Sequence, residues 1–330
     1  MEGWTSEVSA GVERRLSAFF DEERARVTQL APQAEVLHGA IAALTMRGGK
    51  RLRPAVLYAA YRAVRPDGGF GEVADACAGL EVLQTYLLIH DDWMDGDETR
   101  RGGPSVHAAL RDRFDPALAD RLAILAGNLA CAWSWRLFGA GEAVRDVVLR
   151  MHEEVLVGQQ LDLMAVEDVS RMHRLKTGSY TLRGPIALGA VLGGASAAQR
   201  EALDAFAAPL GEAFQLRDDL LGTFGDPRDT GKSAGNDLCA GKRTALVLAA
   251  ERSGADLREL RAVFGVLDAP APAIAAARAL LERSGARRAV ETRLDALLAE
   301  ADAALARAPL AESGRAMLAE LAARLAHRAH

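Results

Sequence analysis

The chain has 330 residues, 50% of them hydrophobic and 26% charged, so it carries enough apolar surface for one large core and is unlike a disordered protein. Its net charge of -5 argues against a nucleic-acid partner, which would require an excess of basic residues. The 3 cysteines lack the paired spacing of a zinc site or a disulfide framework, which favours the reducing cytoplasm. No stretch reaches the roughly 18 apolar residues of a membrane span, so we expect no integral membrane segment.

Apolar residues recur at helical spacing along most of the chain, as at Val290, Leu294 and Leu297, whereas alternating strand-like runs are hard to find. Glycine and proline cluster between the periodic segments in the way of inter-helix loops. No linker looks like a domain boundary. We therefore predict an all-α protein with a single domain over residues 1–330.

The first candidate motif along the chain is Gly48-Gly49-Lys50-Arg51-Leu52-Arg53-Pro54, which places cations beside glycine. The Walker pattern is absent and no strand precedes the motif, so it does not indicate a nucleotide-binding loop. Alone, the motif is weak evidence for a function, and its meaning depends on the order and number of the motifs that follow.

A largely apolar helix is predicted over residues 80–89, and it runs directly into His90-Asp91-Asp92-Trp93-Met94-Asp95. Asp91 and Asp95 lie one turn apart and differ by about 40° around the helix, and Gln84 joins this face two turns earlier. Magnesium prefers such oxygen donors and completes its octahedral shell with water and phosphate oxygens. The motif therefore predicts a diphosphate partner, and a solvated acidic cap is the alternative.

Basic and hydrogen-bonding residues follow at three places. Arg100 and Arg101 precede a glycine turn, which would return two phosphate-binding guanidiniums toward the carboxylates. Further along come Gly158-Gln159-Gln160-Leu161-Asp162 and then Lys176-Thr177-Gly178. Each of these segments supplies charged or polar groups beside a glycine.

A second acidic motif lies at Gln215, Asp218 and Asp219, which share one helical face at i, i+3, i+4 spacing. The segment over residues 222–235 holds 4 glycines and Lys232, as a mobile flap over a phosphate would. Lys242 follows in Gly241-Lys242-Arg243-Thr244. Two buried acidic motifs weaken the interpretation as a surface cap.

In their order and number, these motifs resemble the trans-isoprenyl diphosphate synthase (polyprenyl synthetase) family. The resemblance implies an all-α isoprenoid synthase fold, in which long helices surround a deep central cavity and the two aspartate motifs face each other at its mouth, in a homodimer. It also implies an enzyme that condenses isopentenyl diphosphate with an allylic diphosphate by ionisation, condensation and elimination. The partners would be small isoprenoid diphosphates, and the cofactor a cluster of three Mg²⁺ ions bound with substrate diphosphate.

The same resemblance assigns roles to residues that match the family motifs. The magnesium site would comprise Asp91, Asp92, Asp95, Asp218 and Asp219, with Asp92 and Asp219 in support. The allylic diphosphate would be held by Arg100, Lys176, Lys232 and Lys242. Isopentenyl diphosphate would be held by Gly49, Lys50, Arg53, Gln84 and Arg101. Thr177 and Gln215 would stabilise the carbocation, and Gln159 and Asp162 would orient the metal waters and Lys176.

Product length is set in this family by residues just before the first aspartate motif. Here the fifth position before Asp91 is Tyr86 and the fourth is Leu87, which resembles short-chain members and favours a C20 product over C15. On an ideal helix Leu87 lies about 40° from Asp91 but Tyr86 about 140° away, so ordinary core packing of Tyr86 is an alternative.

The sequence departs from the family at Gly222, where the second motif commonly ends in a third aspartate, and at Trp93, which is bulkier than the usual aliphatic residue. Two other functions fit the same fold. A terpene cyclase would ionise an allylic diphosphate without an isopentenyl site, so Lys50, Arg53, Gln84 and Arg101 argue against it. A non-catalytic subunit of a heteromeric synthase would not need both aspartate pairs.

Overall fold

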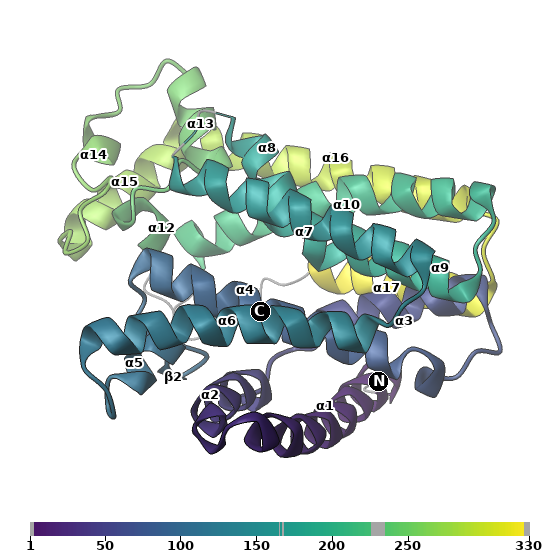
Figure 1. The fold of residues 1–330 in the computed structure, drawn as a ribbon. Helices are drawn as coiled ribbons and strands as arrows, with labels where there is room; N and C mark the ends of the chain where they lie inside the picture. Colours follow the sequence, from purple (N-terminus) through teal and green to yellow (C-terminus); the bar gives the residue numbers. More distant parts are fainter. Residues whose placement is uncertain (1–2, 165, 167, 226–234, 327–330) are drawn as a thin grey trace. The chain divides into compact units, whose positions relative to one another are not determined.

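The computed structural model describes residues 3–164, 166, 168–225 and 235–326. The chain forms two compact units, which we call unit 1 (Met1–Val148 with Ala187–Ala195) and unit 2 (Leu149–Ile186 with Ser196–His330). Helices α7 (Glu142–Leu163) and α9 (Gly184–Gly193) belong in part to each unit (Figure 1). Long helices dominate both units, which confirms the prediction of an all-α fold. The assignment of residues 1–330 to one domain remains a prediction.

Unit 1 is built from helices joined by short loops, with one small hairpin. Its remaining helices are α1 (Gly3–Leu30), η1 (Pro32–Ala34), α2 (Glu35–Met46), α3 (Leu52–Val64), η2 (Phe70–Glu72), α4 (Ala74–Asp95), α5 (Val106–Leu110) and α6 (Pro116–Phe138). The hairpin pairs β1 (Thr99–Arg100) with β2 (Gly103–Pro104) in antiparallel register.

Helix α4 packs over much of its length against α6. The reason lies in the sequence of α6, whose buried face carries the small residues Ala119, Ala123, Ala126, Gly127 and Ala130. A β-carbon at Gly127 would overlap the ring of His90 on α4. Small residues therefore let the two helices approach closely, which fixes the direction of the α4 end that bears the first aspartate motif.

Unit 2 consists of the rest of α7 and α9 together with the helices of the C-terminal half. These are α8 (Val169–His173), η3 (Arg174–Arg183), α10 (Ala197–Phe224), α12 (Asn236–Cys239), α13 (Ala245–Arg252), α14 (Arg258–Arg261), α15 (Ala271–Arg283), α16 (Ala286–Arg307) and α17 (Glu312–Ala326). Segment η3 is π-helical, a geometry that is rare and often found at functional sites.

Helix α10, which bears the second aspartate motif, begins with a capping box. Ser196 accepts a hydrogen bond from the backbone of Gln199, whose side chain in turn accepts one from the backbone of Ser196. Along its length α10 packs against α16. Buried Leu220, Leu246 and Leu294 belong to one apolar cluster that joins α10, α13 and α16. This core holds the second motif in place.

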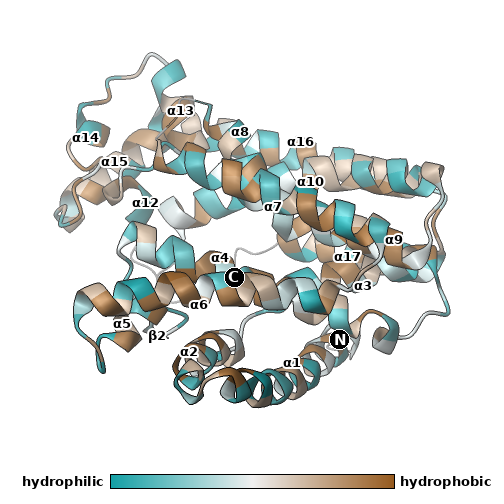
Figure 2. Cartoon of the chain, viewed as in Figure 1, coloured by the Kyte–Doolittle hydropathy of each residue, from teal (hydrophilic) through white to brown (hydrophobic). Residues whose placement is uncertain are grey.

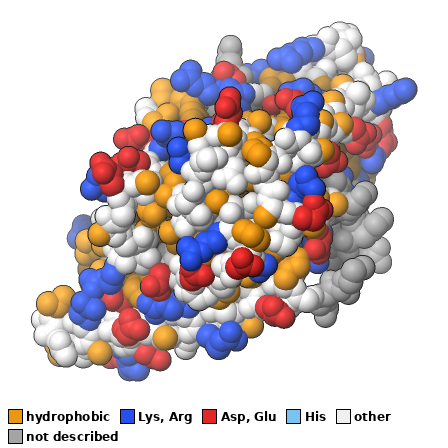
Figure 3. Space-filling view, turned by 90° about the vertical axis from the view of Figure 1, so that its right-hand side faces the viewer, with side chains coloured by type: hydrophobic (Ala, Val, Ile, Leu, Met, Phe, Trp, Pro, Cys, Tyr) orange, Lys and Arg blue, Asp and Glu red, His pale blue; other side chains and the backbone are white. Residues whose placement is uncertain are grey.

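The long helices are amphipathic, so hydrophobic and hydrophilic residues alternate along them (Figure 2). On the face drawn in Figure 3, basic and acidic side chains are interspersed. None of the helices among the described residues combines the length and the apolar character that a bilayer-spanning segment requires.

Candidate functional site

The first aspartate motif forms the last turn of α4, which ends at Asp95 because Gly96 adopts a left-handed conformation with φ of 71°. Asp91 and Asp95 are one turn apart on the accessible side of the helix, and the Asp91 side chain is 24% exposed. Asp92 points the other way and is fully buried. The middle aspartate therefore has a different environment from its neighbours.

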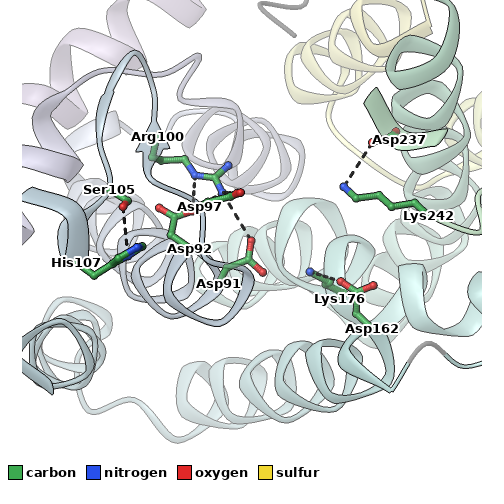
Figure 4. Close-up of polar contacts among 10 residues, drawn as sticks. All are labelled: Asp91, Asp92, Asp97, Arg100, Ser105, His107, Asp162, Lys176, Asp237 and Lys242. Atoms are coloured by element: carbon green, nitrogen blue, oxygen red, sulfur yellow. Dashed lines mark hydrogen bonds and ion pairs between the residues drawn. The ribbon is translucent and has the colours of Figure 1, made fainter. Parts of the chain in front are cut away.

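Arg100 neutralises part of this acidic group. Its Nε donates to Oδ1 of Asp92 at 2.7 Å, and its Nη2 lies 4.0 Å from Asp91 and 3.2 Å from Asp97 (Figure 4). Burial alone would lower the pKa of Arg100, but the hydrogen bond and charge of Asp92 outweigh it, so the pKa lies above its ordinary value. The second oxygen of Asp92 is buried and accepts no hydrogen bond from the described residues. The carboxylates of Asp91, Asp92 and Asp97 thus share one arginine.

The hairpin that carries Arg100 is a tight turn. Arg101 and Gly102 occupy its two central positions with φ of 52° and 72°, as a type I′ turn requires. Arg47 holds the hairpin in place, because its Nη1 donates to the backbone oxygens of Arg100 and Pro104, both at 2.8 Å. The sequence predicted a turn after both arginines, whereas the structure places Arg101 within it.

Arg101 reaches the loop between α2 and α3. Its Nη1 lies 3.5 Å from the backbone oxygen of Leu44, and a β-carbon at Gly49 would be 3.6 Å from its guanidinium carbon. Lys50 is exposed and Arg53 partly buried at the start of α3. The structure therefore brings Gly49 and Arg101 together, two of the residues predicted to bind isopentenyl diphosphate.

Between Lys50 and Arg53, Arg51 turns into the protein interior. Its Nη1 donates to Oε2 of Glu81 at 2.5 Å and its Nη2 donates to the backbone oxygen of Thr45 at 3.1 Å. The side chains of Arg51 and Glu81 are 1% and 3% exposed. To reach Glu81, Arg51 adopts a left-handed backbone conformation with φ of 44°. This buried ion pair fixes the junction between the loop that carries Lys50 and the start of α3, where Arg53 lies.

Positive charge is in excess in this part of unit 1. The pKa of Arg101 lies below its ordinary value because burial disfavours the charged form, and the like charges of Arg51, Arg53 and Arg100 add to the effect. Glu81 acts in the opposite direction. Half-buried cations held together by the fold favour a polyanion in contact with them.

In unit 2, η3 lies directly against α7. A β-carbon at Gly158 would overlap the backbone of Lys176, so only glycine permits this approach. One turn later, Oδ2 of Asp162 accepts a hydrogen bond from Nζ of Lys176 at 2.5 Å (Figure 4). The role of Asp162 in orienting Lys176 in the site remains a prediction. Gln159 is partly buried, and its Nε2 finds no acceptor among the described residues.

In the second aspartate motif, as in the first, one aspartate is accessible and its neighbour is buried. Asp218 is exposed, whereas Asp219 is 2% exposed. Asp219 accepts a hydrogen bond from the backbone N–H of Ala245 at 2.9 Å and another from Nε2 of Gln215 at 2.9 Å. Asp219 thus caps the start of α13, just after the loop that carries Lys242. Burial raises the pKa of Asp219 to about 6.

Lys242 forms an ion pair with Asp237 on α12, with Nζ 3.5 Å from Oδ1 (Figure 4). His173 lies within the electrostatic reach of Asp162, Lys176, Lys242 and Asp237. Burial is the main reason that the pKa of His173 falls to about 4, so this histidine is neutral at physiological pH. Lys232 lies outside the described residues.

The two residues predicted to set product length differ in their surroundings. Tyr86 is 6% exposed and packs edge-on against His90, with ring centroids 5.0 Å apart. Leu87 is partly exposed. The role of Tyr86 in product length and the alternative of ordinary core packing both remain predictions.

Several residues of this region were not anticipated from the sequence, namely Arg47, Arg51, Glu81 and Asp237. Arg51 offered a signal, since it stands between two predicted phosphate ligands. Glu81 was visible as the one acidic residue in the apolar run before the first motif. Their pairing spans 30 residues of sequence and no local spacing predicts it.

Comparison with known proteins assigns the chain to a family. The model of the family described as polyprenyl synthetase matches residues 34–279, more than half of the chain. The chain belongs to the polyprenyl synthetase family. The resemblance predicted from the motifs is thereby confirmed.

Relatives of this polyprenyl synthetase include short-chain enzymes. A short chain isoprenyl diphosphate synthase of Methanocaldococcus jannaschii is 34% identical over 227 residues, 64% of this chain and 65% of the relative. A farnesyl diphosphate synthase of Geobacillus stearothermophilus is 35% identical, over 68% of this chain and 82% of the relative. A geranylgeranyl diphosphate synthase of Mycobacterium tuberculosis is 35% identical, over 76% and 74%. This polyprenyl synthetase is therefore a transferase.

Solved structures agree. A geranylgeranyl pyrophosphate synthase from Corynebacterium glutamicum, complexed with isoprenyl diphosphate and magnesium, matches with a TM-score of 0.87 and 34% identity, over 98% of this chain and 99% of that one. One from Pyrococcus horikoshii matches with a TM-score of 0.79 and 25% identity, over 98% of each chain. The all-α fold of this polyprenyl synthetase is that of the isoprenyl diphosphate synthases.

Proposed function

We propose that this polyprenyl synthetase condenses isopentenyl diphosphate with an allylic diphosphate to give a short-chain, all-trans prenyl diphosphate, with C20 favoured over C15. The observation that carries the proposal is the pair of arginines on one hairpin. Arg100 is engaged by the carboxylates of α4, while Arg101 lies in a separate cationic group beside Gly49. This arrangement supports the binding of two different anions by residues of unit 1.

Isopentenyl diphosphate would be bound by the cationic group of unit 1, with Arg101, Lys50 and Arg53 donating to its phosphate oxygens and Gln84 completing the site. The backbone at Gly49 allows a close approach, and the buried pair of Arg51 and Glu81 holds the loop in position. No protein nucleophile is needed, because the double bond of this substrate attacks the allylic cation.

The chemistry of the acidic residues suits magnesium. No three His, Cys, Asp or Glu side chains gather as a metal cage within the described ranges. Magnesium commonly takes one or two carboxylates together with water and substrate phosphates. Asp91 and Asp95 in unit 1 and Asp218 in unit 2 would be direct ligands, Asp92 and Asp219 would support them, and three ions would bind with the diphosphate. When bound, magnesium would neutralise charge developing on the leaving diphosphate.

The allylic diphosphate would be held by Arg100 and by Lys176, Lys232 and Lys242. These cations stabilise the departing diphosphate, the kind of electrostatic contribution that is usually largest in catalysis. Asp162 orients Lys176 through the hydrogen bond to its ammonium group, and Gln159 lies one turn before Asp162 on the same helix. Oxygen atoms of Thr177 and Gln215 would face the carbocation, and the departing diphosphate would accept the proton lost in the final step.

The competing functions are less well supported. A terpene cyclase uses a single diphosphate substrate and has no need for the cationic group around Arg101. A non-catalytic subunit has no need for a retained aspartate pair with an oriented arginine. Trp93 in the first motif is 39% exposed.

A homodimer in the cytoplasm completes the proposal. Helix α7 exposes Leu149, Leu156 and Leu163 at seven-residue spacing, with Val157 beside them, and exposed leucines at such spacing mark a helix-packing surface. Cys77, Cys131 and Cys239 are free thiols, as is usual in a reducing compartment.

Incubation of the purified protein with isopentenyl diphosphate, magnesium and dimethylallyl, geranyl or farnesyl diphosphate tests the proposal. Chromatography of the products should show longer prenyl diphosphates that end at C20. Cyclic hydrocarbons formed from the allylic substrate alone would support the cyclase. Absence of product with every primer would support the non-catalytic subunit.

A further inference from the structure

Arg47 lies between the two segments of unit 1 that carry the predicted phosphate-binding cations. It is the residue at which α2 ends, and residues 48–50, with two glycines and a lysine, follow it directly. Its side chain contacts the hairpin that carries Arg100 and Arg101. The backbone of Arg47 therefore leads into one of these segments, while its guanidinium holds the other.

The contact between Arg47 and the hairpin is made with both strands. Nη1 donates to the backbone oxygen of Arg100 on β1 and to that of Pro104 on β2, at 2.8 Å in each case. A β-carbon at Gly103 would lie 2.9 Å from the guanidinium carbon of Arg47, so glycine there lets the guanidinium approach the hairpin backbone. One nitrogen that binds both strands fixes the hairpin as a unit, and with it the directions of Arg100 and Arg101.

The charge of Arg47 adds to the cations already present in this region. Its acceptors are two neutral backbone oxygens, and no acidic side chain in the described part of the chain forms an ion pair with it. Arg100, by contrast, is paired with Asp92. A contact that served the fold alone would be made better by a neutral donor, because repulsion from Arg100 and Arg101 opposes a third guanidinium. A cation at position 47 is favoured when diphosphates bind beside the hairpin.

We propose that Arg47 is a positioning residue shared by two substrates, which aligns Arg100 for the allylic diphosphate and Arg101 for isopentenyl diphosphate. The identity of both substrates rests on the proposed function. Arg47 acts through the hairpin, because its Nη1 is engaged by the backbone of both strands. Since one guanidinium holds both strands, its loss affects the binding of the two diphosphates together.

The affinity for each diphosphate can be measured without turnover. Isothermal titration calorimetry with isopentenyl diphosphate alone reports on one substrate, and an allylic thiolodiphosphate with magnesium, which resists ionisation, reports on the other. Arg47→Met keeps the apolar stem and removes the donors, and should weaken both affinities by about tenfold. Arg24→Met removes an exposed arginine of the same unit, paired with Glu35, and should change neither affinity. Unchanged affinity for either diphosphate in Arg47→Met overturns the proposal.

A double-mutant cycle separates positioning from a general effect on the fold. In the Arg101→Met background, Arg47→Met should weaken the binding of isopentenyl diphosphate by about twofold or less, because the side chain that it aligns is already gone. Binding of the allylic analogue should still fall by about tenfold in that background, because Arg100 remains. Equal losses of affinity for isopentenyl diphosphate in the two backgrounds overturn the proposal, since Arg47 would then act independently of Arg101. Circular dichroism and Tm identify any variant that fails to fold.

The proposed reaction and the role of Arg47 fail separately. If no primer is elongated but the calorimetric series behaves as expected, the reaction is wrong and the role of Arg47 in aligning the hairpin stands. If prenyl diphosphates form but Arg47→Met binds both diphosphates as tightly as the unaltered protein, the reaction stands and the role of Arg47 is wrong.

Discussion

The guanidinium of Arg51 lies against the carboxylate of Glu81 in the interior of unit 1, with Nη1 2.5 Å from Oε2 and both side chains almost fully buried. Charges in such a place are tolerated only because each satisfies the other. Arg51 stands between Lys50 and Arg53 in the chain, so this pair links the stability of the unit to the segment that we propose binds isopentenyl diphosphate.

Loss of one member of this pair should therefore be costly. Glu81→Ala leaves Arg51 buried and unpaired, and we expect the free energy of unfolding to fall by about 3 to 5 kcal/mol in urea denaturation. Glu259→Ala, which removes an exposed partner of Arg283, is the control and should cost about 1 kcal/mol or less. Similar losses in the two variants would contradict the role of burial.

Arg101 should matter for the acceptor substrate. Arg101→Met keeps the apolar stem but removes the donors, and should lower kcat/KM for isopentenyl diphosphate by roughly 10- to 100-fold, the cost of hydrogen bonds to a charged group. Arg113→Met, an exposed arginine at the surface of unit 1, serves as the control. An effect confined to the allylic substrate would show that Arg101 is assigned to the wrong diphosphate.

The two neighbouring aspartates of the first motif should behave differently. Asp91→Ala should abolish metal-dependent turnover and leave the helical circular dichroism largely intact, because Asp91 is partly exposed. Asp92→Ala should in addition lower Tm, since it leaves the partly buried Arg100 without its main acceptor. Full activity in Asp91→Ala would remove the metal assignment of this motif.

Asp219 should make stability depend on pH. Its pKa is about 6 in the folded protein against 3.8 ordinarily, so the folded state holds the proton more tightly than the unfolded state. Relative to Asp219→Asn, the protein should therefore lose stability as pH rises from about 4 to 6, by at most about 3 kcal/mol. Urea denaturation in the presence of a chelator measures this difference, and a constant difference across that pH range would show that the pKa is not raised.

The chain length of the product should show whether Tyr86 or Leu87 limits it. Tyr86→Ala should lengthen the product if the ring closes the cavity, and Leu87→Ala should do so if the residue on the Asp91 face is the limit. Product chromatography with farnesyl diphosphate distinguishes the two. An unchanged product distribution in Tyr86→Ala would mean that its contact with His90 is ordinary core packing.

Local spacing predicted much of this protein. The positions of Asp91 and Asp95 follow from helical periodicity, and the second motif follows from the same rule. The all-α class follows from apolar periodicity. Each of these conclusions depends on residues within two helical turns of one another, where geometry is nearly independent of the rest of the fold.

Contacts between residues far apart in the sequence cannot be predicted from local spacing. The different environments of Asp91 and Asp92 depend on where α6 and the hairpin lie, and the capping of α13 by Asp219 joins positions 26 residues apart. The approach of Asp237 to Gly222, where a β-carbon would overlap Oδ2 of Asp237, depends on the course of α12. Glycine at position 222 looked like the loss of a ligand, because the sequence does not show what fills the space.

Under the proposed function, the hairpin of unit 1 would keep the two diphosphate substrates apart. Arg100 belongs to a strand and turns toward Asp92, whereas Arg101 begins the turn and reaches toward Leu44. Two adjacent residues thus point in different directions, and under the proposed function Arg100 would serve the allylic diphosphate and Arg101 the isopentenyl diphosphate. Because Arg101 lies in a two-residue turn with φ of 52°, inserting or deleting one residue here would change the turn type and with it the directions of the two guanidiniums. The length of this short hairpin therefore matters as much as the charge of its two arginines.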